Sequence, residues 1–194
     1  DSERSRGLGD VYKRQLASMG SWYQAFKAGK CNDVQARFWQ RKQAEEFYII
    51  KNDPFQVRNL AGKKEHREVF NGLREKLRKE ILRTRDTGLI PEGMYARLAG
   101  PGTIHAFAQN KDYPADEVLA AASKAVRGDL GAGLSFSRGC LQHNSALMRY
   151  WGATGALMLR KEAAALSDDL VELLEDPVFC LLYTSDAADE CSGV

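Results

Sequence analysis

Histidine and cysteine side chains are the groups of this 194-residue chain that could serve as metal ligands, bases or nucleophiles. The three histidines, His66, His105 and His143, are widely separated and show none of the short spacings of a metal-binding pair. The internal cysteines Cys31 and Cys140 are also far apart, which supports neither a zinc site nor a disulfide framework. The spacing therefore predicts surface histidines and no catalytic, cofactor-binding or metal-binding residue in this chain.

Two loop motifs that carry chemistry in many enzymes are missing from the sequence. Glycines recur between residues 128 and 139, but a phosphate-binding loop would end in Gly-Lys-Ser or Gly-Lys-Thr at the start of a helix. No Gly-x-Ser-x-Gly segment, which would present a nucleophilic serine, occurs either. The carboxylates are scattered over expected helices, where solvation accounts for them, and the sequence alone indicates no catalytic site.

A short strand is the first element that the pattern predicts with a definite end. Residues 45–50 are rich in Phe, Tyr and Ile, which suit a pleated surface. Asn52 and Asp53 accept local backbone hydrogen bonds, and Pro54 pushes the residue before it out of helical space. A turn should therefore follow the strand.

Helices are expected over most of the remaining chain. Apolar residues recur at spacings of three and four through 64–85, and Thr87-Gly88 should close that helix. An irregular connection, rich in glycine, should lead to a helix that begins near Pro114. Two further amphipathic helices within 144–175 resemble one unit of a HEAT-like helical repeat, with the glycine-rich stretch before them as a weakened helix.

The two ends of the chain resemble one DNA element read in opposite directions. Residues 10–15 (Asp-Val-Tyr-Lys-Arg-Gln) can be written GAT GTG TAT AAG AGA CAG. The reverse complement of that string, shifted by one base, encodes Cys-Leu-Leu-Tyr-Thr and begins a codon for Ser, which is the sequence of residues 180–185. We therefore expect 1–15 and 180–194 to be tails derived from a sequencing adaptor, and we set them aside from the fold.

Composition restricts the class of partner only weakly. The net charge of +2 is well short of that of a dedicated nucleic-acid-binding protein, and no retained run of about 18 apolar residues predicts a membrane span. Aromatic and basic residues do alternate within 16–44, and 63–85 is strongly basic. Such segments could bind nucleic acid or a sulfated glycan, but a solvated helix face and aromatics packed on a neighbouring domain explain them more simply.

Residues 45–61 (Glu-Glu-Phe-Tyr-Ile-Ile-Lys-Asn-Asp-Pro-Phe-Gln-Val-Arg-Asn-Leu-Ala) resemble the C-terminal signature of the sulfatase family. In that family a strand of the type Glu-Leu-Tyr-Asp-Leu leads to Asn-Asp-Pro, then to Asn-Leu-Ala and an amphipathic helix. Residues 85–92 and the approach at 29–46 resemble neighbouring phrases of one bacterial branch. Residues 149–155 are similar to a helical-repeat extension carried by some of these sulfatases. A departure is the glycine-rich 128–139 stretch.

The resemblance implies a parent protein that hydrolyses sulfate esters or sulfamates with a calcium ion and a formylglycine made from Cys or Ser. It also implies a sulfated small molecule or glycan as substrate and a periplasmic or extracellular location. The family signature Cys-x-Pro-x-Arg is not matched at Cys31 or Cys140, since neither cysteine has a proline two places later. No catalytic or metal-binding residue is therefore carried over to this chain, which should lack activity alone.

The sequence as a whole predicts an α+β fragment. Short strands of a small C-terminal antiparallel sheet with a packing helix should form a partial sulfatase C-terminal subdomain over 16–112. An all-α HEAT-like helical-repeat segment, also partial, should follow over 113–179. We expect no cofactor in this fragment, no nucleic acid and no membrane segment, and packing on an N-terminal catalytic domain. A non-enzymatic helical-repeat interaction module is the alternative.

Overall fold

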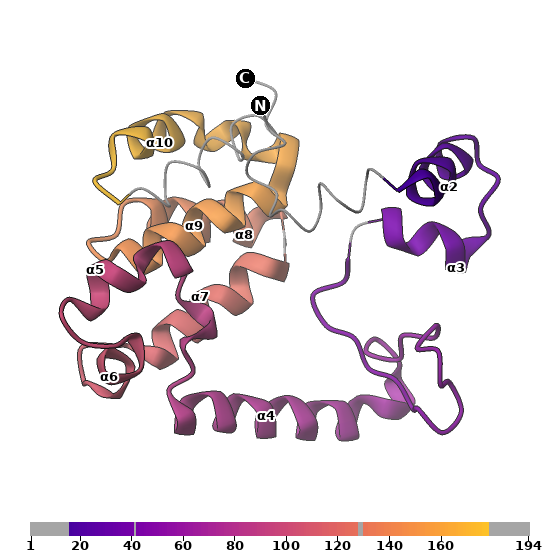
Figure 1. Ribbon diagram of the computed structural model, residues 1–194, viewed down its shortest axis with the longest axis horizontal. Helices are drawn as coiled ribbons and strands as arrows, with labels where there is room; N and C mark the ends of the chain where they lie inside the picture. Colours follow the sequence, from indigo (N-terminus) through magenta and orange to yellow (C-terminus); the bar gives the residue numbers. More distant parts are fainter. Residues whose placement is uncertain (1–15, 41, 128–129, 179–194) are drawn as a thin grey trace. The chain divides into compact units, whose positions relative to one another are not determined.

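The computed structural model describes residues 16–40, 42–127 and 130–178, so the adaptor-like tails lie outside the described residues. Helices, labelled in Figure 1, are the regular elements throughout these ranges. The chain divides into two compact units, one ending at Asn71 and the other beginning at Gly72. No helix in the described ranges is both long and apolar enough to cross a membrane.

The predicted strand at 45–50 does not form, and the α+β fold class is wrong for the described part of the chain, which is all-helical. Residues 45–49 are not paired with any strand. One backbone hydrogen bond reaches them from the other side of the turn, from Leu60 N–H to the carbonyl of Phe47 at 2.8 Å. The side chain of Asn59 makes two more hydrogen bonds to this segment: it accepts the backbone N–H of Phe47 and donates to the carbonyl of Glu45. The β-forming residues are present, but a sheet needs further strands with which to share its hydrogen bonds.

The first unit opens with α2 (Ala17–Lys27), α3 (Asp33–Ala36) and a 3₁₀ turn, η1 (Arg37–Trp39). Asn32 and Gln35 form a capping box that starts α3, since each side chain accepts the backbone N–H of the other residue. The aromatic residues of this segment were expected to pack on a neighbouring domain, but the structure shows them in contact with one another: the ring centroids of Trp22 and Phe38 lie 5.1 Å apart. Trp39 is the common neighbour of these rings. They form a small cluster of their own.

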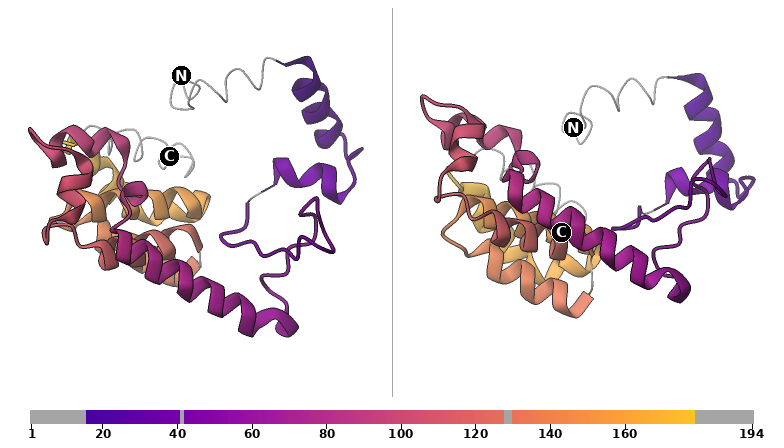
Figure 2. Two further views of the ribbon diagram at one scale, coloured as in Figure 1. Left: turned by 60° about the horizontal axis from the view of Figure 1, so that its bottom comes forward. Right: turned by 90° about the horizontal axis from the view of Figure 1, so that it is seen from below.

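The helix predicted over 64–85 is confirmed as a 3₁₀ turn, η2 (Lys64–His66), followed by α4 (Arg67–Thr84), which Figure 2 shows as one continuous helix. Its end differs from the prediction. Arg85, not Gly88, adopts the left-handed conformation, with φ of 53°. Its guanidinium group donates hydrogen bonds to the carbonyls of Ala108, Asn110 and Tyr113, and these bonds offset the cost of that backbone geometry.

The connection after α4 is more ordered than its glycines indicate. Short helices fill it: η3 (Thr87–Leu89), η4 (Glu92–Met94), α5 (Tyr95–Ala99) and α6 (Ile104–Gln109). The side chains of Met94 and Tyr113 are fully buried, and the Tyr113 hydroxyl donates to the carbonyl of Asp86 at 2.9 Å. These buried side chains therefore anchor the segment within the core of the second unit. The glycines and prolines of the segment indicate turns and do not reveal these anchors.

Three helices build the centre of the second unit: α7 (Ala115–Arg127), α8 (Leu130–Leu141) and α9 (Ala146–Leu159). α9 packs against both α7 and α8, as Figure 1 shows. α8 forms although glycines recur in it. Gly152 and Gly155 of α9 lie directly against α8, where a Cβ would meet Cys140 at 2.8 Å and Ser137 at 2.6 Å. Glycine thus allows two helix backbones to approach closely.

The last predicted helix, within 144–175, is broken into three pieces. η5 (Arg160–Leu166), α10 (Ser167–Glu172) and η6 (Leu173–Glu175) follow α9 in turn. Arg160 has a positive φ of 54°, which ends α9, and Leu166 leaves helical geometry between η5 and α10. Apolar residues of all three pieces still face the core, notably Ala163, Leu166, Leu170 and Leu173. The apolar period is as predicted, while the helix that carries it is interrupted.

Candidate functional site

The histidines lie in separate elements, and two have local structural roles. His66 packs its ring edge-on to Phe47, with centroids 6.1 Å apart. His143 uses Nδ1 to accept the backbone N–H of Ser145 at 2.9 Å, just before α9. His105 is exposed on α6. Within the described ranges, no group of three or more His, Cys, Asp or Glu side chains could hold a metal ion.

The two cysteines in the described ranges do not suit a nucleophile. Cys31 is half-buried and precedes the capping residue Asn32. Cys140 is buried on α8, where burial raises the pKa of its thiol although Lys124 opposes the shift. A raised pKa leaves less of the reactive thiolate at neutral pH. The surroundings of these residues fit neither the formylglycine nor the calcium ion that the sulfatase resemblance implies, so we derive no catalytic step from them.

Hydrogen bonds from side chains to the backbone hold together the segment 45–61, the one that carries the family resemblance. The Asp53 carboxylate is largely buried and accepts the backbone N–H groups of Val57 at 3.0 Å and Arg58 at 2.7 Å. These bonds, chiefly that from Val57, hold the pKa of Asp53 below its ordinary value of 3.8, against the opposing effect of burial. The carboxylate thus closes the turn.

The other polar anchor of this loop is Asn59, which joins its two arms. Its Oδ1 accepts the backbone N–H groups of Phe47 and Ala61, each at 3.0 Å, and its Nδ2 donates to the carbonyl of Glu45 at 3.1 Å. One side chain therefore makes three hydrogen bonds to backbone groups that a second strand would otherwise satisfy. Asp53 and Asn59 act as structural residues of the loop.

Acidification should open the Asp53 turn before the Asn59 side of the loop. Because the folded pKa of Asp53 lies below its unfolded value, its stabilisation is complete above about pH 4 and is lost as the pH falls through the folded pKa. Amide hydrogen exchange, corrected for intrinsic rates, should show lost protection at Val57 and Arg58. Phe47 and Ala61, which bond to the neutral Asn59 amide, are the internal control, and equal loss at all four amides would contradict this account.

A groove of about 420 Å³ lies between α8, α9 and the last helical pieces, and its lining includes Arg149, Asp169 and Asp176. Arg149 Nε is 2.7 Å from Asp176 Oδ2, with only 16% and 6% of the two side chains exposed. Asp169 accepts hydrogen bonds from Arg138 at 3.2 Å and from Gln142 at 2.9 Å. Arg149, Asp169 and Asp176 are thus engaged in hydrogen bonds and ion pairs within the protein, which indicates a structural role for these three residues.

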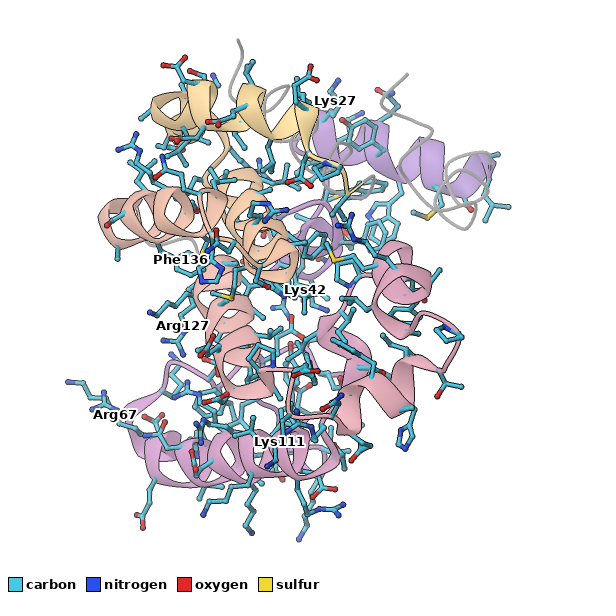
Figure 3. The ribbon with its side chains drawn as sticks, turned by 90° about the vertical axis from the view of Figure 1, so that its left-hand side faces the viewer. Lys27, Lys42, Arg67, Lys111, Arg127 and Phe136 are labelled. Atoms are coloured by element: carbon cyan, nitrogen blue, oxygen red, sulfur yellow. The ribbon has the colours of Figure 1, made fainter. Side chains whose placement is uncertain are left out.

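A second cleft, of about 430 Å³, lies between α7 and α8 and is lined by Lys124, Arg127, Ala132, Gly133, Ser135 and Phe136. We call it the α7–α8 cleft. The Lys124 ammonium lies 5.8 Å from the centre of the Phe136 ring. Figure 3 shows Arg127 and Phe136 on the same side of the molecule, from successive helices. Sequence reasoning missed this grouping because it rejected the glycine-rich stretch as a phosphate loop and otherwise expected only a weakened helix there, without asking which side chains that helix would bring to α7.

Comparison with known proteins adds no relative to this description. The chain matches no protein-family model, no curated protein and no solved structure.

Proposed function

We propose that this chain is the C-terminal part of a sulfatase-type hydrolase, an enzyme that cleaves sulfate esters or sulfamates. The observation that carries the proposal is the phrase at 45–61, followed in order by the amphipathic helix and the phrase at 85–92. The catalytic nucleophile and the metal ligands would belong to the larger N-terminal part of such an enzyme. The present residues would form part of the structure that supports it.

The hydrogen bonds of the 45–61 loop support the proposal because they explain why particular residue types occur in this phrase. Asp53 and Asn59 are the polar residues of Asn-Asp-Pro and Asn-Leu-Ala that hold the loop together. Replacing either would leave backbone N–H groups without their acceptor, so both residue types are needed for this loop. A phrase that specifies a loop in this way is more informative than one that only matches a helical pattern.

An exposed apolar stripe on α4 fits the expected packing on a catalytic domain. Val69, Leu73 and Leu77 follow one another at intervals of four, on one face of the helix, and 58%, 48% and 62% of these residues are exposed. Contiguous large aliphatic side chains are seldom exposed to water on a monomeric protein, and such a patch often marks an interaction surface. We propose that the catalytic domain of the parent enzyme covers this stripe.

Removing the stripe should leave the chain as stable as before and less prone to associate. A variant with Leu73→Gln and Leu77→Gln changes two largely exposed side chains that lie outside the core, so we expect its free energy of unfolding to change by less than about 0.5 kcal/mol. Sedimentation should show less self-association. Leu82→Gln is the matched control, because Leu82 of the same helix packs on the core and its replacement should be destabilising. A large loss of stability in the double variant would contradict the exposure of the stripe.

Recovery of the upstream reading frame on the source DNA tests the proposal directly. We expect it to encode a Cys-x-Pro-x-Arg or Ser-x-Pro-x-Arg motif, and the complete protein should release sulfate from an aryl sulfate ester. Replacing the first residue of that motif by alanine should abolish release. An upstream frame that encodes no such motif would refute the proposal.

A non-enzymatic helical-repeat interaction module is the second candidate, favoured by the packed helices α7, α8 and α9. Such modules stack helix pairs so that each pair covers the next, and a repeat at the end of the stack needs a neighbour. Both candidates are compatible with more helices downstream. The upstream reading frame distinguishes them, since only the first requires a sulfatase nucleophile there.

A further inference from the structure

The α7–α8 cleft combines two cations with one aromatic ring in a concave surface of about 430 Å³. Its volume falls in the range of small-molecule pockets, roughly 300–1,000 Å³. Lys124 and Arg127 are three residues apart on α7 and therefore project from the same side of that helix. Phe136 and the exposed Ser135 come from α8, and the small residues Ala132 and Gly133 leave space between the two helices.

The three helices α7, α8 and α9 place no acidic side chain beside the two cations of the cleft. Lys124 and Arg127 form no ion pair within the described ranges. Neither α8 nor α9 contains an acidic residue. The acidic residues of α7 are Asp116 and Glu117 in its first turn, roughly 10 Å along the helix from Lys124. An anion in the cleft would therefore meet two cations and no repulsion from these three helices, while Glu162 of η5 packs with that helix on α8 and Asp129 of the connection lies outside the described residues.

A structural role for the two cations alone does not explain the whole grouping. Basic residues in the last turn of a helix are favourable because they oppose the negative end of its dipole, and both cations occupy that position. The helix dipole, however, requires neither a cleft beside the cations nor an aromatic ring across it. Phe136 is half-buried and lies near the Lys124 ammonium, so an apolar surface and a charge face the same space.

We propose that the α7–α8 cleft binds a sugar that carries a tetrahedral oxyanion, either sulfate or phosphate. Lys124 and Arg127 donate hydrogen bonds to the anionic oxygens, Ser135 Oγ donates to an adjacent oxygen, and the C–H face of the sugar ring packs on Phe136. Sulfate and phosphate share this recognition chemistry, so the two sources are separated by experiment. The inference rests on the cleft alone and does not depend on the proposed sulfatase parent.

The size of the cleft favours such a ligand over a nucleic acid. Binding along a nucleic-acid strand needs a track of cations and several stacking rings, because charge and stacking recur at each nucleotide. The lining of the cleft provides two cations and one ring. That set matches one anionic group attached to one ring.

Titration of the complete 194-residue chain by two-dimensional amide NMR tests the proposal. Glucose 6-sulfate and glucose 6-phosphate should shift the amide signals of Lys124, Arg127, Ser135 and Phe136, with Kd on the order of 1 mM for so few exposed contacts. Inorganic sulfate should bind more weakly, and glucose should not bind. Preference for the sulfated or the phosphorylated sugar identifies the source of the anion. Absence of shifts with either sugar at tens of millimolar would overturn the proposal.

Matched variants separate the cleft from general attraction to a basic chain. Replacing Lys124 and Arg127 by Gln should weaken binding of both anionic sugars at least tenfold. Replacing the exposed Lys76 and Lys79 of α4 by Gln removes the same charge elsewhere and should change nothing. Phe136→Leu should weaken the sugars several-fold without affecting inorganic sulfate. Equal weakening by the two charge variants, or tighter binding of a single-stranded oligonucleotide at both places, would overturn the proposal, and each amide spectrum shows whether its variant is folded.

Discussion

Replacing Arg149 by alanine should lower the free energy of unfolding of the second unit by about 3–5 kcal/mol. Arg149 Nε donates to Asp176 at 2.7 Å, and its terminal nitrogen donates to the backbone carbonyls of His143 and Asn144 at 2.8 and 2.9 Å. The guanidinium group thus joins the start of α9 to the turn after η6. Alanine would leave the Asp176 carboxylate, which is 6% exposed, without its counter-charge.

The loss should exceed that of a simple ion pair because three acceptors are abandoned together. Among the residues that the structure describes, Asp176 would keep only the N–H of Val178, which its Oδ1 accepts at 2.9 Å. Arg149→Lys retains the charge but cannot reproduce the planar set of donors, so its effect should be intermediate. Urea unfolding followed by far-ultraviolet circular dichroism measures all three proteins.

An exposed ion pair in the same chain provides the control. Arg83 and Glu80 lie 2.6 Å apart on α4, with 70% and 57% of their side chains exposed. Arg83→Ala should lower the free energy of unfolding far less than Arg149→Ala does, because water screens and solvates both partners of the exposed pair. If Arg83→Ala and Arg149→Ala lowered the free energy of unfolding by similar amounts, burial of the Arg149–Asp176 pair would contribute nothing to stability.

Helices were predictable from the sequence where an apolar period was sustained. The spacing of Val69, Leu73 and Leu77 indicates α4 correctly, yet these residues are exposed, so periodicity identified the helix and not what covers it. The core of the second unit was less visible. Tyr113 and Met94 are fully buried in a segment whose glycines and prolines indicated only turns.

The strand at 45–50 shows why residue type alone was insufficient. Phe47, Tyr48 and Ile49 favour extended backbone, but a strand is defined by its partner, and Asn59 replaces most of that partner with one side chain. The sequence phrase at 45–61 was recognised, whereas the hydrogen bonds made by its polar residues were not foreseen. A polar residue that satisfies backbone groups fourteen positions away carries no local signal.

The α7–α8 cleft was missed for a related reason. Lys124 and Arg127 could be placed on one helix face, but Phe136 comes from a helix that the glycines were expected to weaken. Glycine reduces helix stability by its own flexibility, so a run of glycines is read as a break. In this unit close contact with α9 stabilises α8, and such tertiary packing overrides intrinsic propensity.

Gly152→Ala should therefore destabilise the second unit, although alanine is the better helix former. An added Cβ would lie 2.8 Å from Cys140 Cβ and 2.9 Å from the backbone nitrogen of Leu141, both closer than van der Waals contact permits. The Leu141 nitrogen belongs to the α8 backbone, so no side-chain rotation can relieve the contact. Separation of the helices should cost about 1–3 kcal/mol, as overpacking of a close-packed core does.

The matched control is Gly139→Ala, on the helix that faces Gly152. No atom lies within 4 Å of a Cβ added there, so only the helix preference of alanine acts, and stability should rise by roughly 0.5–1 kcal/mol. The same substitution should thus have opposite signs on the two helices, which a general effect of glycine replacement cannot produce. Urea unfolding of both variants measures the difference. A Gly152→Ala protein as stable as the Gly139→Ala protein would mean that α8 and α9 lie farther apart than this packing requires.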